Sequence, residues 1–104
     1  MPTFALLTKL SPETTANLDS KEEMGRTWYS KIKQSCPGVR WLHHFAILGP
    51  YDFMDIYEAE NEEEAAKVSM VTLANGAAEA INWTLIPYQR YLAMIKDLES
   101  KGVL

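Results

Sequence analysis

Apolar positions along the chain follow two different periodicities, and prolines separate the segments. Residues 3–10 (TFALLTKL) form a short apolar run, which predicts a buried strand. The segment from Ser20 to the residue before Pro37 instead has helical spacing, and Ser20 is suited to cap its first turn. The residues that recur at four-residue spacing in this segment are Met24, Trp28 and Ile32. The chain is therefore predicted to open with a strand and an amphipathic helix.

The next part of the chain has the pattern of a β-hairpin. Residues 39–48 (VRWLHHFAIL) and 51–59 (YDFMDIYEA) are rich in aromatic and β-branched residues, and Gly49-Pro50 separates them. Gly followed by Pro fits the two central positions of a type II′ turn. In that register Asp55 lies directly opposite His44, whereas a loop shifted by one residue places the pair on a diagonal.

The second half of the chain repeats the helix–strand pattern. Residues 61–75 predict a helix opened by Asn61 and closed at Gly76, and residues 79–86 predict a fourth strand. A further helical stripe follows Pro87. The order β-α-β-β-α-β plus a terminal helix predicts an α+β, ferredoxin-like fold, with two helices on one face of an antiparallel sheet.

Alternation along the hairpin divides its side chains between the two faces of the sheet. The set with four large apolar residues at its centre is predicted to face the helices: Trp41, His43, Phe45, Ile47, Asp52, Met54, Ile56 and Glu58. The open face is then predicted to carry Leu42, His44, Ala46, Leu48, Tyr51, Phe53, Asp55 and Tyr57. In the fourth strand the polar residues Asn82 and Thr84 are two positions apart and therefore point to the same face, which is predicted to be the open face. A one-residue bulge in the hairpin would move the side chains on one side of the bulge to the opposite face.

Composition limits the classes of function. The chain has 104 residues, 47% of them hydrophobic, a net charge of −4 and one Cys, which fits a single domain over residues 1–104. A nucleic-acid footprint is not expected without a basic stripe, and no apolar run is long enough for a membrane span. A single Cys gives neither an intrachain disulfide nor a Cys-based zinc site, so we expect a cytoplasmic protein.

At the hairpin the sequence resembles a known family. Residues 2–13 (PTFALLTKLSPE), together with the turn Gly49-Pro50-Tyr51-Asp52, resemble GYD-domain proteins, which are small bacterial and archaeal proteins. The resemblance extends from Pro2 to about Leu98. It implies a ferredoxin-like protomer of the dimeric α/β-barrel type, in which two sheets pair face to face, and it brings no catalytic residue with it. Asp55 departs from the pattern, since an apolar strand residue is usual there.

The leading functional hypothesis is a homodimer, or a larger homo-oligomer, formed through the open sheet face and binding a small organic ligand in its lumen. The residues predicted to line that lumen are Leu42, His44, Leu48, Phe53, Asp55, Tyr57, Asn82 and Thr84. The alternative is that these side chains fill the interface completely.

A second hypothesis is a cofactor-independent oxygenase or isomerase that acts on an aromatic or quinone-like compound. His44 would take a proton and Asp55 would orient the imidazole, with Asn82 or Tyr57 available to an oxyanion. The pair has an alternative interpretation as two buried polar groups that satisfy each other. No haem, metal or other cofactor is expected, because the adjacent His43 and His44 point to opposite faces of a strand.

A third hypothesis is an assembly protein. The last helix has more apolar surface than one stripe requires, and part of it could pack dimers together. The residues concerned are Tyr88, Tyr91, Leu92, Met94 and Ile95.

Overall fold

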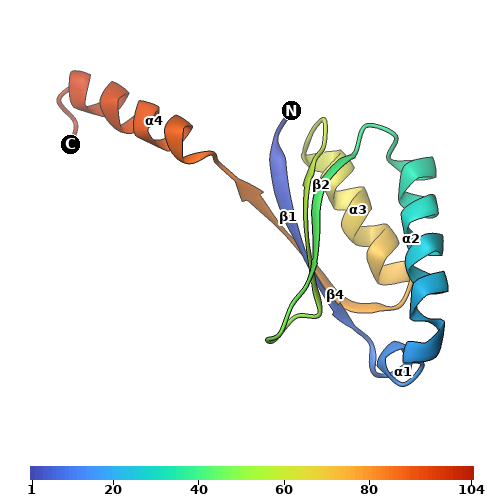
Figure 1. Cartoon of the computed structure of the whole chain (residues 1–104). Coiled ribbons are helices and arrows are strands. Elements are labelled where there is room, and N and C mark those ends of the chain that lie inside the picture. The colour runs from blue at the N-terminus through green and yellow to red at the C-terminus, as the bar shows by residue number, and fades with distance from the viewer.

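A four-stranded antiparallel sheet is the frame of the structure, a computed structural model that describes residues 1–104. The strand order across the sheet is β2-β3-β1-β4, so the first strand of the chain lies inside the sheet (Figure 1). The strands are β1 (Thr3–Leu10), β2 (Arg40–Ala46), β3 (Phe53–Glu58) and β4 (Ala77–Leu85). This confirms the predicted ferredoxin-like, α+β architecture.

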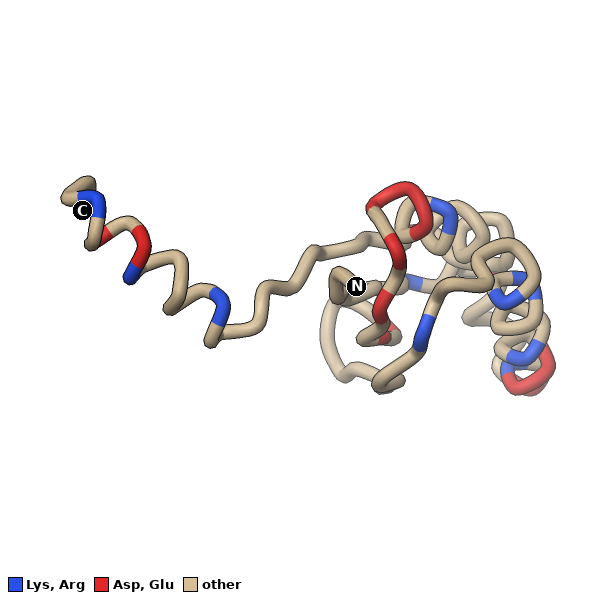
Figure 2. The backbone as a smooth tube through the Cα atoms, turned by 90° about the horizontal axis from the view of Figure 1, so that it is seen from above, with Lys and Arg blue, Asp and Glu red and all other residues tan.

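Two long helices cover one face of this sheet, and a third leaves it. Helices α2 and α3 lie side by side against the sheet, whereas α4 extends away from it (Figures 1 and 2). A short helix and a 3₁₀ turn connect β1 to α2. The helical elements are α1 (Pro12–Thr15), η1 (Leu18–Ser20), α2 (Lys21–Ser35), α3 (Glu62–Ala74) and α4 (Tyr88–Ser100). No helix combines the length and the apolar character needed to cross a bilayer.

Of the two predicted N-terminal helix caps, Asn61 is confirmed and Ser20 is not. Asn61 caps α3 as expected, because its side-chain oxygen accepts a hydrogen bond from the backbone N–H of Glu64 at 2.9 Å. The prediction that Ser20 caps α2 with its side chain is wrong. The Ser20 hydroxyl instead donates to the carbonyl of Asn17 at 3.0 Å, because the 3₁₀ turn η1 runs directly into α2.

The hydrophobic core lies between the sheet and the two covering helices. Leu6 and Tyr57 from the sheet are fully buried against Ile32 of α2 and Val68 of α3. The Tyr57 hydroxyl donates a hydrogen bond to the side chain of Asn82, which satisfies the phenol inside the core. This packing places the helices firmly on the Tyr57 side of the sheet.

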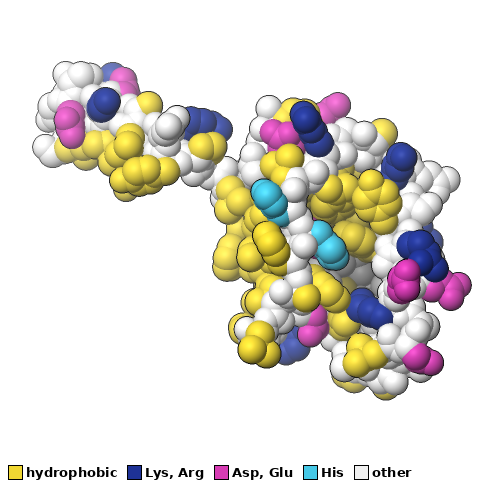
Figure 3. All heavy atoms as spheres, in the orientation of Figure 1, with side chains coloured by type: hydrophobic (Ala, Val, Ile, Leu, Met, Phe, Trp, Pro, Cys, Tyr) yellow, Lys and Arg dark blue, Asp and Glu magenta, His cyan; other side chains and the backbone are white.

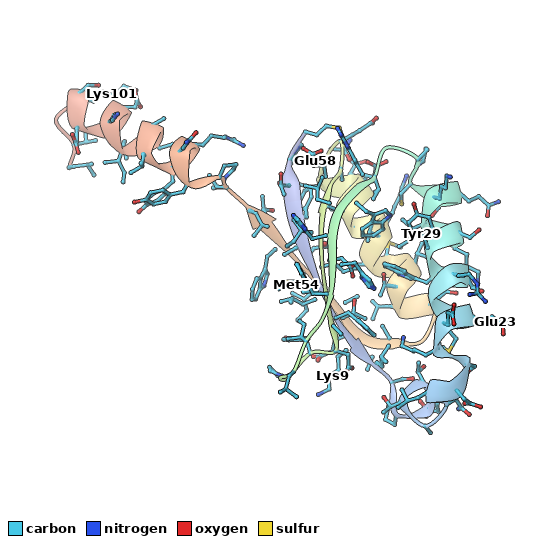
Figure 4. The ribbon with its side chains drawn as sticks, viewed as in Figure 1. Lys9, Glu23, Tyr29, Met54, Glu58 and Lys101 are labelled. Atoms are coloured by element: carbon cyan, nitrogen blue, oxygen red, sulfur yellow. The ribbon has the colours of Figure 1, made fainter.

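The predicted face assignment of the hairpin is therefore wrong for most of its residues. Tyr57 and Asp55 face the helices, whereas Met54 lies on the side away from α2 (Figure 4). The assignment failed because it gave the more apolar set to the helices, whereas the uncovered face of this sheet is apolar as well. A β-bulge explains why Trp41 lies on the predicted side: Trp41 is opposite Tyr57 but His43 is opposite Ile56, so the pairing skips a residue between them. Trp41 thus joins the core side, as predicted, while the rest of β2 and β3 is inverted.

The connection between β2 and β3 also differs from prediction. It spans residues 47–52, and the only glycines with positive φ are Gly76 and Gly102, so Gly49 does not form a type II′ turn. Asp52 instead fixes the connection to the end of β1. Its N–H donates to the Thr8 carbonyl at 2.8 Å, and its carboxylate accepts from the Leu10 N–H at 2.8 Å. The predicted register nevertheless holds, because His44 is opposite Asp55.

Candidate functional site

A half-open cleft of about 750 Å³ lies between α2 and the β2–β3 side of the sheet. Figure 3 shows this hollow with hydrophobic side chains around it and a histidine at its rim. The core is concentrated under α3 and the inner strands, so the outer strand β2 and helix α2 are left apart. The aromatic residues that line the cleft are Trp28, Tyr29, Trp41 and Phe53.

Gly25 keeps the cleft open on the helix side. It lies in the interior of α2 and lines the cleft, and a Cβ added there would meet no atom within 4 Å. Glycine inside a helix costs about 1 kcal/mol relative to alanine. The sequence therefore accepts a weaker helix at the position where a side chain would enter the cleft.

His44 and Asp55 form the polar part of the cleft wall. They face each other across β2 and β3, and His44 Nδ1 is hydrogen-bonded to an Asp55 carboxylate oxygen. The Asp55 side chain is only 3% exposed, whereas that of His44 is 62% exposed. Since an ionised carboxylate can only accept a hydrogen bond, Nδ1 carries the proton. The other ring nitrogen, Nε2, is then free to bond a ligand.

Burial determines the protonation chemistry of Asp55. Desolvation raises the pKa of this carboxyl above its ordinary value, and the hydrogen bond and charge of His44 oppose that rise. A buried carboxyl whose pKa is raised beside an imidazole can hold or exchange a proton with it. The pair is thus chemically suited to proton transfer as well as to orienting the imidazole.

Closely packed aromatic rings form the apolar wall of the cleft. The Trp28 and Trp41 ring centroids lie 5.2 Å apart, and Tyr29 lies 6.3 Å from Trp41. The His44 ring is stacked on Phe53 at 5.8 Å with an interplanar angle of 14°. The indole N–H of Trp28 donates to Thr72 Oγ1 at 2.8 Å, which fixes the indole in place. The cleft is therefore aromatic and largely preformed.

A cationic group stands at the mouth of the cleft. The ammonium of Lys21 lies 4.6 Å from the centroid of the Phe53 ring, a cation–π distance. Burial lowers the pKa of Lys21, and the nearby Asp52 carboxylate opposes that shift. Lys21 and His44 thus lie on the same aromatic ring, Lys21 against it and His44 stacked on it.

The structure brings together only some of the predicted site residues. His44, Asp55 and Phe53 all line the cleft, although on the helix side of the sheet and not in a lumen on its open face. Tyr57 and Asn82 were placed in that lumen wrongly. They bond to each other in the core, and Asn82 also donates to the carbonyl of Ala65 in α3 at 3.0 Å.

The remaining predicted ligand-binding residues do not line the cleft. Leu42 lies at the bulge and is 42% exposed, and Leu48 is fully exposed in the β2–β3 connection. Thr84 is exposed near the end of β4. None of these three side chains lines the cleft with His44.

Sequence reasoning missed the contribution of α2 to the site. Trp28 was interpreted as part of a core stripe, and Tyr29, Gly25 and Lys21 were not considered. The signal that pointed to them is the glycine inside an otherwise strong helical pattern, with Lys21 one turn before it and Trp28 one turn after. No three His, Cys, Asp or Glu side chains come together as metal ligands in the structure.

Comparison with known proteins places the chain in a family. The family model described as the GYD domain matches residues 4–95. The chain is 28% identical over 96 residues to a Thermus thermophilus protein named "Glutamine synthetase and cystathionine beta-lyase binding protein", covering 92% of this chain and 100% of that protein. No solved structure matches the chain. Since the family model covers most of its length, from β1 into α4, the chain belongs to the GYD-domain family.

Proposed function

We propose that the protein is a homodimeric binding protein that takes a planar, aromatic small molecule into the cleft between α2 and the hairpin. The observation that carries the proposal is the preformed cleft of about 750 Å³, lined by aromatic rings around one imidazole–carboxylate pair. Small-molecule sites are typically apolar cavities of about 300–1,000 Å³ with a few convergent polar groups. The cleft has that volume and that chemistry.

The arrangement of the lining residues favours a particular kind of ligand. A flat ring can stack against Trp28 or Trp41, while a hydroxyl on it donates a hydrogen bond to the unprotonated Nε2 of His44. Lys21 at the mouth adds positive charge beside Phe53. We therefore expect aromatic acids and phenols to bind more tightly than neutral hydrocarbons of the same size.

Dimer formation is proposed from the uncovered face of the sheet. That face is apolar and no helix of the same chain packs on it, and Trp83 and Phe45 are 55% and 50% exposed. A second copy of the same face would cover it through a two-fold axis, the commonest symmetry of homodimers. The registers place on this face the exposed or half-buried residues Phe45, Met54, Ile56, Ile81 and Trp83, which surround the buried Ala5 and Leu7.

The named relative supports binding as the class of function. The Thermus thermophilus protein is named for binding two enzymes, and the chain matches that protein over its full length. A protein-binding role is therefore also open to this chain, through surfaces outside the cleft. The cleft itself, with a volume of about 750 Å³, has the size of a small-molecule site and not of a protein–protein interface.

Filling the cleft from Gly25 tests the ligand-binding proposal. In a Trp83→Phe background, Trp28 and Trp41 report on the cleft, and their fluorescence is titrated with 2-naphthoate and 2-naphthol. We expect quenching that saturates, with the Kd raised at least about tenfold by Gly25→Leu, whose side chain would displace part of the ligand.

Gly25→Ala is the matched control. Its methyl group meets open space and strengthens α2 by about 1 kcal/mol, so the Kd should stay within a factor of about two. Equal affinity of the Gly25→Leu variant and the parent would contradict binding in this cleft, as would an absence of saturable quenching by both compounds.

A second candidate function, catalysis in the same cleft, is favoured by one specific observation. Asp55 is almost completely buried, its pKa is raised, and it bonds directly to His44 at the cleft wall. That arrangement suits a cofactor-independent oxygenase or isomerase, in which His44 takes a proton from a phenol or activated C–H group and Asp55 stabilises the imidazolium.

Oxygen uptake separates catalysis from binding. The protein is incubated with anthrone and O₂, whose reaction gives anthraquinone and water, with one oxygen atom of O₂ entering the ring at the activated C–H group. Catalysis predicts uptake above the uncatalysed rate that disappears in His44→Ala and persists in His43→Ala, since His43 lies on the other face of the sheet. Rates equal to the uncatalysed reaction in the unchanged protein would contradict the oxygenase.

A further inference from the structure

Helix α4 is the only long element that packs on nothing in its own chain. It follows β4 after Ile86 and Pro87, extends away from the body, and has no buried residue (Figures 1 and 2). The molecule consequently measures 57 × 30 × 18 Å, with a radius of gyration of 16.6 Å. A compact chain of this length would have a radius of gyration of about 13 Å.

The helix is amphipathic, so one of its sides requires cover. Tyr88, Tyr91 and Leu92 are 69%, 50% and 38% exposed, and Ile95 continues their stripe at helical spacing. Isolated helices of about this length are marginal in water and depend on packing of their apolar face. The apolar side of α4 is therefore expected to lie against another surface.

That surface is not on the same protomer. Only Ile86 and Pro87 separate β4 from α4, and Pro87 has φ −55° and ψ 138°. A residue before proline is restricted to extended conformations, so the short connection continues the direction of β4 and carries the helix off the sheet. Folding α4 back onto its own sheet would require a sharp reversal within these two residues.

The apolar side of α4 and the open face of the sheet border the same space. α4 projects on the side of the sheet opposite to α2 and α3 (Figures 1 and 2), and Met54 points to that side (Figure 4). Figure 3 shows hydrophobic side chains along the lower side of α4 and on the adjoining side of the body. The two surfaces thus form an apolar corner that a single partner could fill.

We propose that a second copy of this chain occupies the corner and that α4 of each protomer packs against the open sheet face of the other. We call this contact the α4 clasp. This inference rests on the homodimer proposed above and adds the element that completes it. A two-fold axis through the corner would cover both sheet faces and both helices at once, leaving no apolar surface of either kind exposed. A partner of another kind would have to match two surfaces set at an angle.

The size of the interface supports this role for α4. Four strands about 4.8 Å apart and about 20 Å long present a face of roughly 400 Å², whereas a stable interface buries about 800 Å² per partner. One side of a 13-residue helix, about 20 Å long and about 10 Å wide, adds roughly 200 Å². The sheet face alone is small for a stable dimer, and α4 supplies about half of the missing area.

Sedimentation equilibrium on α4 variants tests the clasp. The double substitution Leu92→Asp and Ile95→Asp places two charges on the apolar stripe, and Arg90→Asp changes a charge on the polar side as a control. We expect the double variant to raise the dimer Kd at least about 100-fold, the control to leave it within about threefold, and circular dichroism of the body to be unchanged. Trp83→Asp tests the sheet face in the same way.

An intermolecular measurement shows where α4 lies. A spin label on Ser100→Cys reacts selectively because the native Cys36 is buried. Mixed with ¹⁵N-labelled unchanged chain, it should broaden amide signals of the open sheet face in the labelled chain. A dimer that shows no such broadening, or that tolerates the α4 double variant but not Trp83→Asp, would overturn the clasp and leave α4 for another partner. A monomeric unchanged protein would overturn the proposed homodimer itself.

Discussion

At the scale of single residues, the protein separates two kinds of buried polar group. Tyr57 and Asn82 bond to each other and to α3 in the core, where both are structurally satisfied. Asp55 is equally buried, yet its partner His44 is mostly exposed at the wall of the cleft. Only the second pair joins the interior to a surface that a ligand can reach, which is why chemistry is proposed for it and not for Tyr57.

The buried carboxyl of Asp55 makes stability depend on pH. Its pKa in the folded protein is raised from the ordinary 3.8, so the folded state binds this proton more tightly than the unfolded state does. The resulting stabilisation is complete below the unfolded pKa and is lost as the pH rises through the folded pKa. We expect the free energy of unfolding to fall as the pH rises above about 4 on account of this group.

The measurement is a set of urea denaturations across the acidic range. Asp55→Asn cannot titrate, so its free energy of unfolding should lose that downward slope, whereas Asp52→Asn should keep it because Asp55 is unchanged. Parallel pH profiles for the Asp55→Asn variant and the unchanged protein would show that this carboxyl does not carry the effect.

At the scale of secondary-structure elements, the periodicity of apolar residues and the positions of prolines and capping residues were sufficient to predict the order of strands and helices. The first strand was predicted with its observed bounds, Thr3–Leu10, and Asn61 capped α3 as expected. These features depend on local rules, namely apolar runs, caps and prolines, which act within a few residues. They could therefore be predicted without knowledge of the packing around them.

The hairpin shows where local rules fail. The strands and the pairing of His44 with Asp55 follow from the sequence, but the face assignment inverted because it gave the helices the more apolar set. In this sheet both faces are apolar, one against the core and one uncovered. The polar pair favours a cavity or a subunit interface on the open face, whereas Asp55 is buried on the helix side and satisfied by its cross-strand partner. Counting apolar residues cannot decide between two such faces.

The cleft could not be predicted for a related reason. It arises because α2 and β2 stand apart, and that distance depends on how the core under α3 fills. Gly25 is the one local signal of it, and a helical glycine has several possible causes. The site residues on β2 and β3 were thus predicted from the hairpin, whereas those on α2 became visible only in the folded structure.

At the scale of the whole molecule, the apolar surfaces are distributed over three places: the core, the open sheet face and α4. Only the first is covered within one chain. Single exposed apolar residues are ordinary on protein surfaces, but a continuous uncovered face is typical of an interaction site. We infer that the functional unit is larger than one chain and that the cleft, on the opposite side of the sheet, remains accessible in it.

Native mass spectrometry of the untagged protein with 2-naphthoate tests the central claim most directly. The account predicts a dimer that carries up to two ligand masses, one for the cleft of each protomer, and a Gly25→Leu dimer that carries clearly fewer at a ligand concentration near the Kd of the unchanged protein. A dimer of the unchanged protein without added mass at saturating 2-naphthoate would contradict ligand binding in the cleft. A monomer would contradict the assembly on which the account of the open face depends.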